Sequence, residues 1–198
     1  MLTSLKLVEY GIPTPDTCIA FKEESSIEAI KAHLHYPTII KPLVGSWGRL
    51  IARLDDYNSA MANLECRETM GNAFQKIYYL QKYIPTVNTT KPTDIRLLVI
   101  GNEPVAAMGR FSPENEFRSN LAIGGTAKPY PIDDEIKALS LNAKNAVKGE
   151  IVGVDLMEED GQLKIIEVNG TPQFRGISTA TKIDIAEKMV GYLLENYA

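Results

Sequence analysis

The sequence predicts an α+β fold with mostly antiparallel sheets arranged in two lobes. Two observations predict this class: helix-like and strand-like segments are mixed without a regular βαβ alternation, and neighbouring strand patterns are separated only by short turns. A third observation, a polar connector over residues 85–92, separates the two halves. We therefore expect an N-terminal lobe over residues 1–83 and a C-terminal lobe over residues 84–198.

The first half opens with a helix-like segment over residues 4–10, which Gly11 is expected to end. The segment TCIAF then predicts a short strand. Ser25 or Ser26 can cap the next helix, which the pattern extends to residue 34. The first lobe is therefore expected to begin with a helix, a strand and a second helix.

The rest of the first half predicts a strand pair, a helix and a further strand. The segment PTIIKPL and residues 50–54 are strand-like, and the loop VGSWGR between them is typical of a hairpin tip. Asp55 or Asp56 is expected to begin a helix that closes at Gly71. The segment KIYYLQKYI is rich in aromatic and β-branched residues, so it predicts the last strand before the connector.

The second half begins with a predicted hairpin. The segments TDIRLLVIG and PVAAMGRF are strand-like and flank a turn expected at Asn102 and Glu103. Residues 112–131 are rich in Gly, Pro, Ser and Asn, which predicts a loop. Asp133 or Asp134 then caps a helix.

A second hairpin and a last helix complete the predicted elements. Residues 153–174 form two strand-like runs around a turn expected at Asp160 and Gly161. Residues 183–197 show a helical pattern. The second lobe is therefore expected to contain two hairpins and two helices.

Composition and charge exclude several classes of protein. The net charge of −4 provides no global field that would attract nucleic acid. The longest apolar runs are too short to span a bilayer, and no signal peptide is recognisable. Cys18 and Cys66 lack the spacing of a metal site and fit a reducing compartment. We expect a cytoplasmic protein with neither a nucleic-acid nor a membrane partner.

Polar residues interrupt both strands of the second hairpin. Glu167 and Asn169 are two residues apart, so they point to the same side of their strand. If the turn is centred near Gly161, Asp155 lies opposite Glu167 on the other strand. Oxygen ligands of this kind suit a hard cation such as Mg²⁺. The alternative, a solvated polar face of an antiparallel sheet, is common.

A lysine and a glycine-containing loop provide a candidate phosphate site. Lys41 ends an apolar strand, and Gly45, Ser46 and Gly48 follow in the loop. Backbone N–H groups of such a loop can bind phosphate oxygens, and the lysine adds a positive charge. Trp47 at the loop tip can pack on a ligand or on another subunit. The alternative is an ordinary hairpin with glycine at its turn.

Three arginines add positive charge in the second half. Arg96 and Arg110 fall on predicted strands, and Arg118 lies in the loop beside Ser119 and Asn120. Guanidinium groups bind carboxylate or phosphate bidentately, although a surface salt bridge is the alternative for each of them. The combination with the loop and the Asp/Glu/Asn hairpin indicates phosphate chemistry.

Lys41 and the segments GSWGR, LQKYI, DIR, FRSNLAIGG, GVDL and EVN, in this order, resemble the ATP-grasp ligases. The resemblance covers nearly the whole chain. The sequence is most similar to the branch that ligates an amino acid to the amino-group carrier protein LysW in lysine and arginine biosynthesis, and is more distantly similar to the ribosomal-protein glutamate ligase RimK. The resemblance implies an ATP-grasp fold, in which two α+β lobes clasp ATP.

The resemblance also implies roles for individual residues. Lys41 binds phosphate and Arg96 contacts the nucleotide, while Arg110 and Asn120 act at the reacting phosphate. The phosphate-covering loop holds Gly45, Ser46, Trp47, Gly48 and Arg49, and the adenine hinge comprises Gln81, Lys82, Tyr83 and Ile84. Asp155, Glu167 and Asn169 match the Mg²⁺ ligands, and the substrate is expected at Arg118, Ser119, Arg175, Gly176, Ile177 and Thr179.

The implied reaction is amide formation through an acyl phosphate. ATP phosphorylates the C-terminal glutamate side chain of LysW, and the amino group of glutamate or 2-aminoadipate displaces the phosphate. Gly176 favours glutamate and hence arginine biosynthesis, whereas Ile177 departs from that branch's pattern. A ligase that acts on another protein's tail, or an ATP-binding module without catalysis, is the alternative. The resemblance also implies that relatives carry an additional N-terminal domain. Close relatives form oligomers, so a homo-oligomer is expected here as well.

Overall fold

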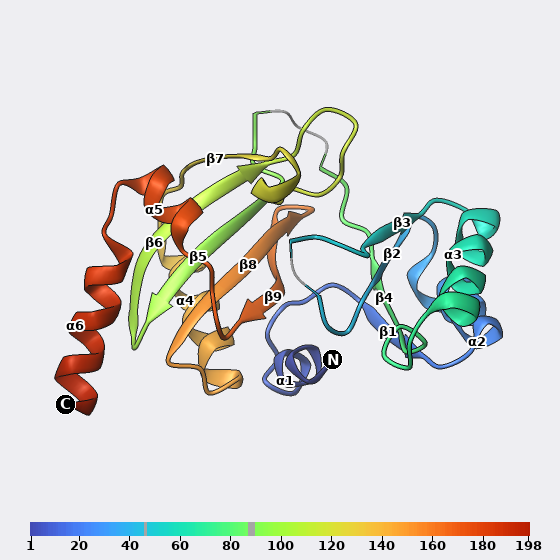
Figure 1. Ribbon diagram of the computed structural model, residues 1–198, viewed down its shortest axis with the longest axis horizontal. Helices are drawn as coiled ribbons and strands as arrows, with labels where there is room; N and C mark the ends of the chain where they lie inside the picture. The colour runs from blue at the N-terminus through green and yellow to red at the C-terminus, as the bar shows by residue number, and fades with distance from the viewer. Residues whose placement is uncertain (46, 87–89) are drawn as a thin grey trace. The chain divides into compact units, whose positions relative to one another are not determined.

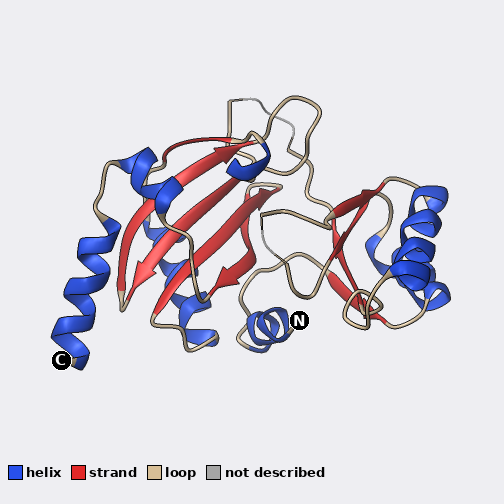
Figure 2. Cartoon of the chain, in the orientation of Figure 1, coloured by secondary structure: helices blue, strands red, loops and turns tan. Residues whose placement is uncertain are grey.

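The computed structural model describes residues 1–45, 47–86 and 90–198, so the predicted loop residue Ser46 lies outside the described residues. Their elements, drawn in Figures 1 and 2, form a four-stranded and a five-stranded sheet with helices, which confirms the α+β class. The chain divides into two units: Met1 with Pro15–Pro85, and Leu2–Thr14 with Thr86–Ala198. Residues 2–14 thus pack with the second unit, although the sequence division places them in the first lobe.

The sheet of the first unit has the strand order β1-β4-β2-β3, and all its pairs are antiparallel. The strands are β1 (Thr17–Ala20), β2 (Thr38–Lys41), β3 (Ala52–Leu54) and β4 (Tyr78–Lys82). The expected hairpin around residues 42–51 is confirmed, because Ile40 at the end of β2 pairs with Ala52 at the start of β3.

Two helices complete the first unit: α2 (Glu23–Ala29), which continues as a π-helical stretch over Ile30–Leu34, and α3 (Tyr57–Met70). They pack with one face of the sheet, where Ile40, Leu54 and Leu80 are fully buried. The predicted start of α3 is confirmed by a reciprocal cap, in which the Asp56 carboxylate accepts from the backbone of Ser59 at 2.7 Å.

The predicted cap of α2 is wrong. The helix begins at Glu23, and Lys22 at its N-cap provides no side-chain hydrogen bond. Ser26 is instead buried inside the helix, where its hydroxyl donates back to the carbonyl of Lys22 at 2.8 Å. A serine can satisfy its hydroxyl on the preceding turn in this way, so its presence alone does not mark a helix start.

The sheet of the second unit has the order β7-β6-β5-β8-β9 and is entirely antiparallel. Its strands are β5 (Asp94–Ile100), β6 (Glu103–Phe111), β7 (Thr126–Pro129), β8 (Ile151–Glu159) and β9 (Gln162–Asn169). The first hairpin turns at Gly101 and Asn102, one residue earlier than expected. β7 lies within the segment expected to be a loop. Its residues are mostly exposed and show no apolar alternation, so the sequence pattern did not indicate a strand there.

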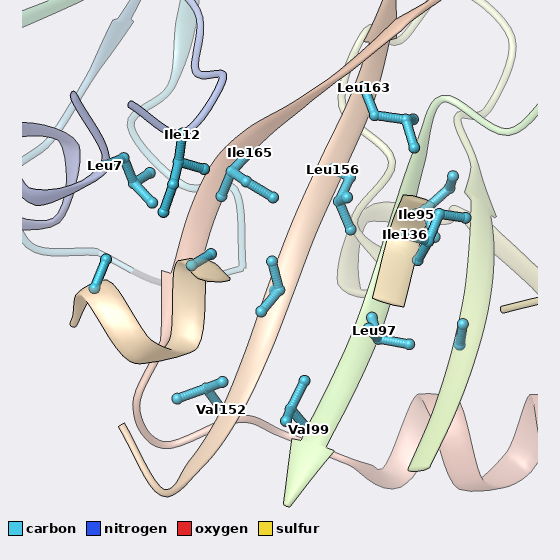
Figure 3. Packing of buried hydrophobic residues seen from close by; sticks show 14 residues of the cluster. Leu7, Ile12, Ile95, Leu97, Val99, Ile136, Val152, Leu156, Leu163 and Ile165 are labelled. Carbon is cyan, nitrogen blue, oxygen red and sulfur yellow. The ribbon is translucent and has the colours of Figure 1, made fainter. Parts of the chain in front are cut away.

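Helices cover both faces of this second sheet. One face packs with α1 (Leu2–Glu9) and α4 (Asp134–Ala146), and Figure 3 shows the apolar side chains there, among them Leu7, Ile136 and Leu97. The other face packs with α5 (Arg175–Thr181) and α6 (Ile185–Tyr197) around Leu98, Met108 and Ile177. α5 lies between the second predicted hairpin and the last predicted helix, where the sequence pattern indicated no element.

The alternation of side chains along β5 positions the polar residues. Ile95, Leu97 and Val99 belong to the core on the α4 face, whereas Leu98 and Ile100 belong to the core on the α5 face. Since successive side chains of a strand point to opposite faces, Asp94 and Arg96 share the α5 face with Leu98.

The described part of the chain contains no helix that is long and apolar enough to cross a membrane.

Candidate active site

The hairpin of β8 and β9 brings the predicted carboxylates together. Asp160 and Gly161 form its turn with φ of 52° and 81°, and the strands pair regularly as far as Leu156 and Ile165. Asp155 then pairs with Glu167, because the register shifts there. A hairpin without this shift would place Ile166 opposite Asp155. The β-bulge therefore keeps Glu167 and Asn169 on the same face as Asp155.

Asp155 is the most heavily paired group of the site. Its Oδ1 accepts from Arg96 Nε at 2.6 Å, and its Oδ2 accepts from Arg96 Nη2 at 2.5 Å. Arg110 Nη2 also lies 3.0 Å from Oδ2. The Asp155 side chain is only 3% exposed, so these ion pairs are largely shielded from solvent. The carboxylate thus holds guanidinium groups from both β5 and β6.

Asp94 extends this network to the loop after β6. It pairs with Arg110 through two hydrogen bonds of 2.6 Å, one from Nε and one from Nη2. Its Oδ2 also accepts from the hydroxyl of Ser119 at 2.8 Å. Asp94, Arg110 and Ser119 are all buried. One continuous set of charge-assisted hydrogen bonds therefore links the loop to β8.

Asn169 connects Arg96 to Glu167. In the orientation that satisfies its amide, Nδ2 donates to Glu167 Oε1 at 3.1 Å and Oδ1 accepts from Arg96 Nη2 at 3.3 Å. Glu167 is exposed, in contrast to Asp155. The three predicted metal-binding residues are therefore neighbours on one face, and the outermost of them is open to solvent.

The charges of the network determine its protonation. Burial raises the pKa of the Asp155 carboxyl, but Arg110 and Arg96 outweigh it and lower the pKa from 3.8 to about 2. Burial likewise lowers the pKa of Arg110, while Asp155 and Asp94 raise it above its ordinary value overall. The two arginines and Asp155 are therefore all charged near neutral pH.

The donor chemistry of this face fits Mg²⁺. Asp155, Glu167 and Asn169 present carboxylate and amide oxygens, which hard cations prefer. Across residues 1–45, 47–86 and 90–198, no group of three or more His, Cys, Asp or Glu side chains is placed to hold a metal ion. A cation here would therefore depend on the amide of Asn169 as well as on the two acids.

In the first unit, Lys41 is joined to the predicted adenine-hinge segment. Its Nζ donates to Gln81 Oε1 at 2.5 Å. Gln81 Nε2 in turn donates to the hydroxyl of Thr17 at 3.0 Å and contacts that of Tyr79 at 3.3 Å. Gln81 is 2% exposed, so these contacts fix a buried amide. The structure thus brings two of the predicted nucleotide-binding residues together.

The other predicted residues of the first unit lie in the loop after β2 and at the end of β4. Trp47 has a φ of 61° and is 46% exposed, and the Arg49 guanidinium lies 5.3 Å from its ring centre. Lys82 ends β4, and Ile84 beyond it is buried. Gly45 and Gly48 lie in the same loop as Trp47. Tyr83 directly follows Lys82, and its ring lies 5.4 Å from the Arg53 guanidinium.

Arg118 is paired within its own loop. It forms hydrogen bonds with both carboxylate oxygens of Glu116, of 3.0 and 2.7 Å. This pair lowers the pKa of Glu116 to about 2. The carbonyl of Asn120 accepts from the backbone of Ile123 and Gly125 at 3.1 and 3.3 Å, which closes the turn after Ser119.

The remaining predicted substrate residues lie on α5. Arg175 and Thr179 are on this helix, and Gly176 faces the side chain of Leu121. Ile177 is only 1% exposed and packs in the core on this face. Its side chain is therefore part of this core, and its role at the substrate site stays a prediction.

Sequence reasoning missed Asp94 as a residue of this site. Its strand begins with the segment DIR, in which Asp94 and Arg96 are two residues apart and so share a face. The pairing of Asp94 with Arg110 follows from the register of β5 and β6. The spacing provided the signal, but the partner strand is needed to recognise it.

Residues 2–193 match the RimK-like ATP-grasp domain. The chain belongs to this family. It is 38% identical to glutamate–LysW ligase ArgX of Sulfolobus acidocaldarius, over 100% of this chain and 68% of that protein. It is 35% identical to α-aminoadipate–LysW ligase LysX of Saccharolobus solfataricus, over 100% of this chain and 69% of that protein.

Solved structures of ATP-grasp proteins share the fold. The RimK domain ATP-grasp protein of Sphaerobacter thermophilus superposes with a TM-score of 0.73 at 23% identity, over 96% of this chain and 64% of that one. The ATP-grasp ligase PsnB in complex with its minimal precursor gives 0.74 at 20% identity, over 98% of this chain and 58% of that one. The chain therefore has the ATP-grasp fold and spans less than two thirds of these structures.

Proposed function

We propose that this chain is an ATP-dependent carboxylate–amine ligase that joins glutamate to the carrier protein LysW. In the proposed reaction the terminal phosphate of ATP passes to the C-terminal glutamate side chain of LysW and leaves ADP. The amino group of glutamate then attacks the acyl phosphate, an amide bond forms, and phosphate departs with loss of the amine's proton. This reaction serves arginine biosynthesis, and we propose that it takes place in the cytoplasm.

The observation that carries the proposal is the 38% identity to glutamate–LysW ligase ArgX across the full chain. The geometry of the second unit supports it. Asp155, Glu167 and Asn169 lie beside two arginines on one sheet face, as a site that handles phosphate and a divalent cation requires.

We assign the residues as follows. Asp155, Glu167 and Asn169 would hold Mg²⁺, which would neutralise phosphate charge. Arg96 and Arg110 stabilise negative charge on the transferring phosphoryl group. Lys41 and the loop residues after it bind phosphate oxygens through a side-chain charge and backbone N–H groups. Gln81, Lys82, Tyr83 and Ile84 hold the adenine, and Arg118, Asn120, Arg175 and Thr179 bind the reacting substrates.

A second candidate substrate is 2-aminoadipate. Relatives named α-aminoadipate–LysW ligase LysX match this chain at 35% and 34% identity, slightly below the matches named for glutamate. Both amino acids present the same amine and α-carboxylate, so the two candidates share one mechanism. The difference lies in the length of the side chain that the site accepts.

Competition between the two amino acids tests this assignment. The chain is incubated with ATP, Mg²⁺ and LysW, and ADP release is followed with each amino acid alone and with both together. We expect a higher kcat/KM for glutamate. A higher kcat/KM for 2-aminoadipate would move the assignment to lysine biosynthesis. ATP binding without ADP release under either condition would support a non-catalytic module.

A further inference from the structure

Four polar side chains share one face of the sheet in the first unit. Thr17 pairs with Gln81 across β1 and β4, and Lys41 pairs with Tyr79 across β2 and β4, the three adjacent strands in Figure 1. Residues that pair across strands point to the same face, and Gln81 and Tyr79 are two residues apart on β4. This face is the one opposite to Leu80, which packs in the core with the helices.

A chain of hydrogen bonds on this face has a fixed direction, which begins at the backbone of Pro15. The Thr17 hydroxyl donates to the Pro15 carbonyl oxygen at 2.8 Å. A carbonyl oxygen cannot donate, so this bond uses the single hydroxyl proton of Thr17. Toward Gln81 the same hydroxyl can therefore only accept, and it accepts from Gln81 Nε2 at 3.0 Å. The NH₂ group of the Gln81 amide is thus fixed toward Thr17.

The orientation of this amide decides what Lys41 meets. With its NH₂ group on Thr17, Gln81 presents Oε1 to the Lys41 ammonium, which donates to it at 2.5 Å. The reversed amide would place two donors, the NH₂ group and the ammonium, against each other. Tyr79, whose hydroxyl lies 3.3 Å from Gln81 Nε2, is compatible with either orientation because a phenol can donate or accept. Gln81 is 2% exposed, so little water can replace a lost partner.

We infer that Thr17 is a positioning residue, which fixes the Gln81 amide so that its carbonyl oxygen holds the ammonium group of Lys41. The bond to Gln81 uses one of the three N–H donors of an ammonium group, so it is compatible with a phosphate oxygen as a second acceptor. The consequence for ATP rests on the proposed function, in which Lys41 binds phosphate. The positional claim concerns contacts within the first unit, so it is measurable without any substrate.

Two substitutions of Thr17 and the chemical reactivity of Lys41 test the positional claim. Thr17→Val removes the hydroxyl at nearly constant side-chain size, whereas Thr17→Ser keeps it. The rate at which acetic anhydride acetylates Lys41, followed by mass spectrometry without nucleotide, reports how firmly the amine is held. Lys76, in an exposed pair with Glu68, serves as the internal reference. We expect severalfold faster acetylation of Lys41 in Thr17→Val and a rate close to that of the parent in Thr17→Ser.

A matched control and a double-mutant cycle separate this route from a general loss of stability. Thr38 is a buried threonine of the same sheet, and its hydroxyl donates to the carbonyl of His35 at 2.5 Å, so Thr38→Val should leave the Lys41 rate unchanged. Gln81→Met removes the amide and should itself speed acetylation of Lys41. Adding Thr17→Val to Gln81→Met should then have almost no further effect.

Three outcomes would overturn the inference. They are an unchanged Lys41 rate in Thr17→Val, an equal rise in Thr17→Ser, and an equal effect of Thr17→Val with and without Gln81.

Nucleotide binding, measured by calorimetry, tests the consequence for phosphate. Thr17→Val should raise the Kd for ATP by roughly 3- to 10-fold, the range that one hydrogen bond contributes. The Kd for adenosine should stay the same, because adenosine has no phosphate for Lys41 to bind. Equal weakening of both ligands would contradict an effect that passes through Lys41. A parent chain that does not bind ATP would count against the proposed function alone, because the acetylation rates decide the positional claim.

Discussion

At the scale of single residues, the site depends on carboxylates that hold arginines away from solvent. Asp94 accepts three hydrogen bonds, two from Arg110 and one from Ser119, and its side chain is 7% exposed. A buried guanidinium that loses one partner retains its desolvation cost. Asp94 therefore acts on the site through Arg110 and Ser119.

Asp94→Asn should lower the free energy of unfolding by about 3 kcal/mol. This is the low end of the cost of breaking a buried ion pair, because Arg110 remains paired with Asp155. Urea unfolding followed by circular dichroism measures this change. The matched control is Asp55→Asn, which disrupts an exposed pair with Arg53 and should cost less than about 1 kcal/mol. Equal losses for the two variants would contradict the structural role of the network.

Glu167 tests the metal assignment. Glu167→Gln keeps the size of the side chain but removes its charge, so Mg²⁺-dependent ADP release should fall by ~100-fold or more, since metal ions stabilise the transition state by several kcal/mol. Glu158→Gln, on the neighbouring strand and in an exposed pair with Lys91, is the control and should retain activity. Undiminished turnover of Glu167→Gln at every Mg²⁺ concentration would remove this residue from the metal site.

At the scale of elements, the turn of the second hairpin was predictable and its bulge was not. Asp160 and Gly161 favour a tight turn, and the positions of Asp155 and Glu167 on facing strands follow from it. Regular pairing from that turn, however, places Ile166 opposite Asp155, and the register shift corrects it. Two adjacent isoleucines suit either face of a buried strand, so the sequence contains no signal for the extra residue.

The helix ends show the same limit. Asp56 was predictable as a cap, because its side chain and Ser59 satisfy each other's backbone groups. α5 and β7 were missed since a short helix and a mostly exposed edge strand have little apolar periodicity. The burial of Ile177 likewise depends on packing against distant strands, which local sequence does not reveal.

The turn itself gives an element-scale prediction. Gly161 has a φ of 81°, and a Cβ there would meet nothing within 4 Å, so Gly161→Ala adds backbone strain without a clash. We expect a loss of about 1 kcal/mol in the free energy of unfolding. Gly191→Ala, in the interior of α6, should instead stabilise by roughly 0.5–1 kcal/mol. Thermal unfolding of both variants checks this, and a stabilising Gly161→Ala would contradict the assigned turn.

At the scale of the whole molecule, the buried network predicts how stability depends on pH. The pKa of Asp155 is lowered from 3.8 to about 2 in the folded protein, chiefly because Arg110 and Arg96 outweigh burial. A carboxyl group whose pKa is lower in the folded than in the unfolded protein stabilises the fold at pH values above its unfolded pKa. This stabilisation is lost as the pH falls through the folded pKa. Stability should therefore decline between about pH 4 and about pH 2.

Urea midpoints measured across this pH range provide the check. The Asp155→Asn variant lacks the titrating carboxyl, so its midpoint should fall less steeply than that of the parent in the same window. Glu116, whose pKa Arg118 also lowers to about 2, remains in both proteins and contributes a common slope. Identical slopes for parent and variant would show that Asp155 is not the group responsible.

The central claim is that this RimK-like ATP-grasp chain joins glutamate to LysW at the expense of ATP. The most direct measurement is the intact mass of LysW after incubation with the chain, ATP, Mg²⁺ and glutamate. We predict that LysW gains the mass of one glutamyl residue, with one ADP formed per LysW modified and no change when Mg²⁺ is omitted. Unmodified LysW in the presence of a chain that binds ATP would contradict the account.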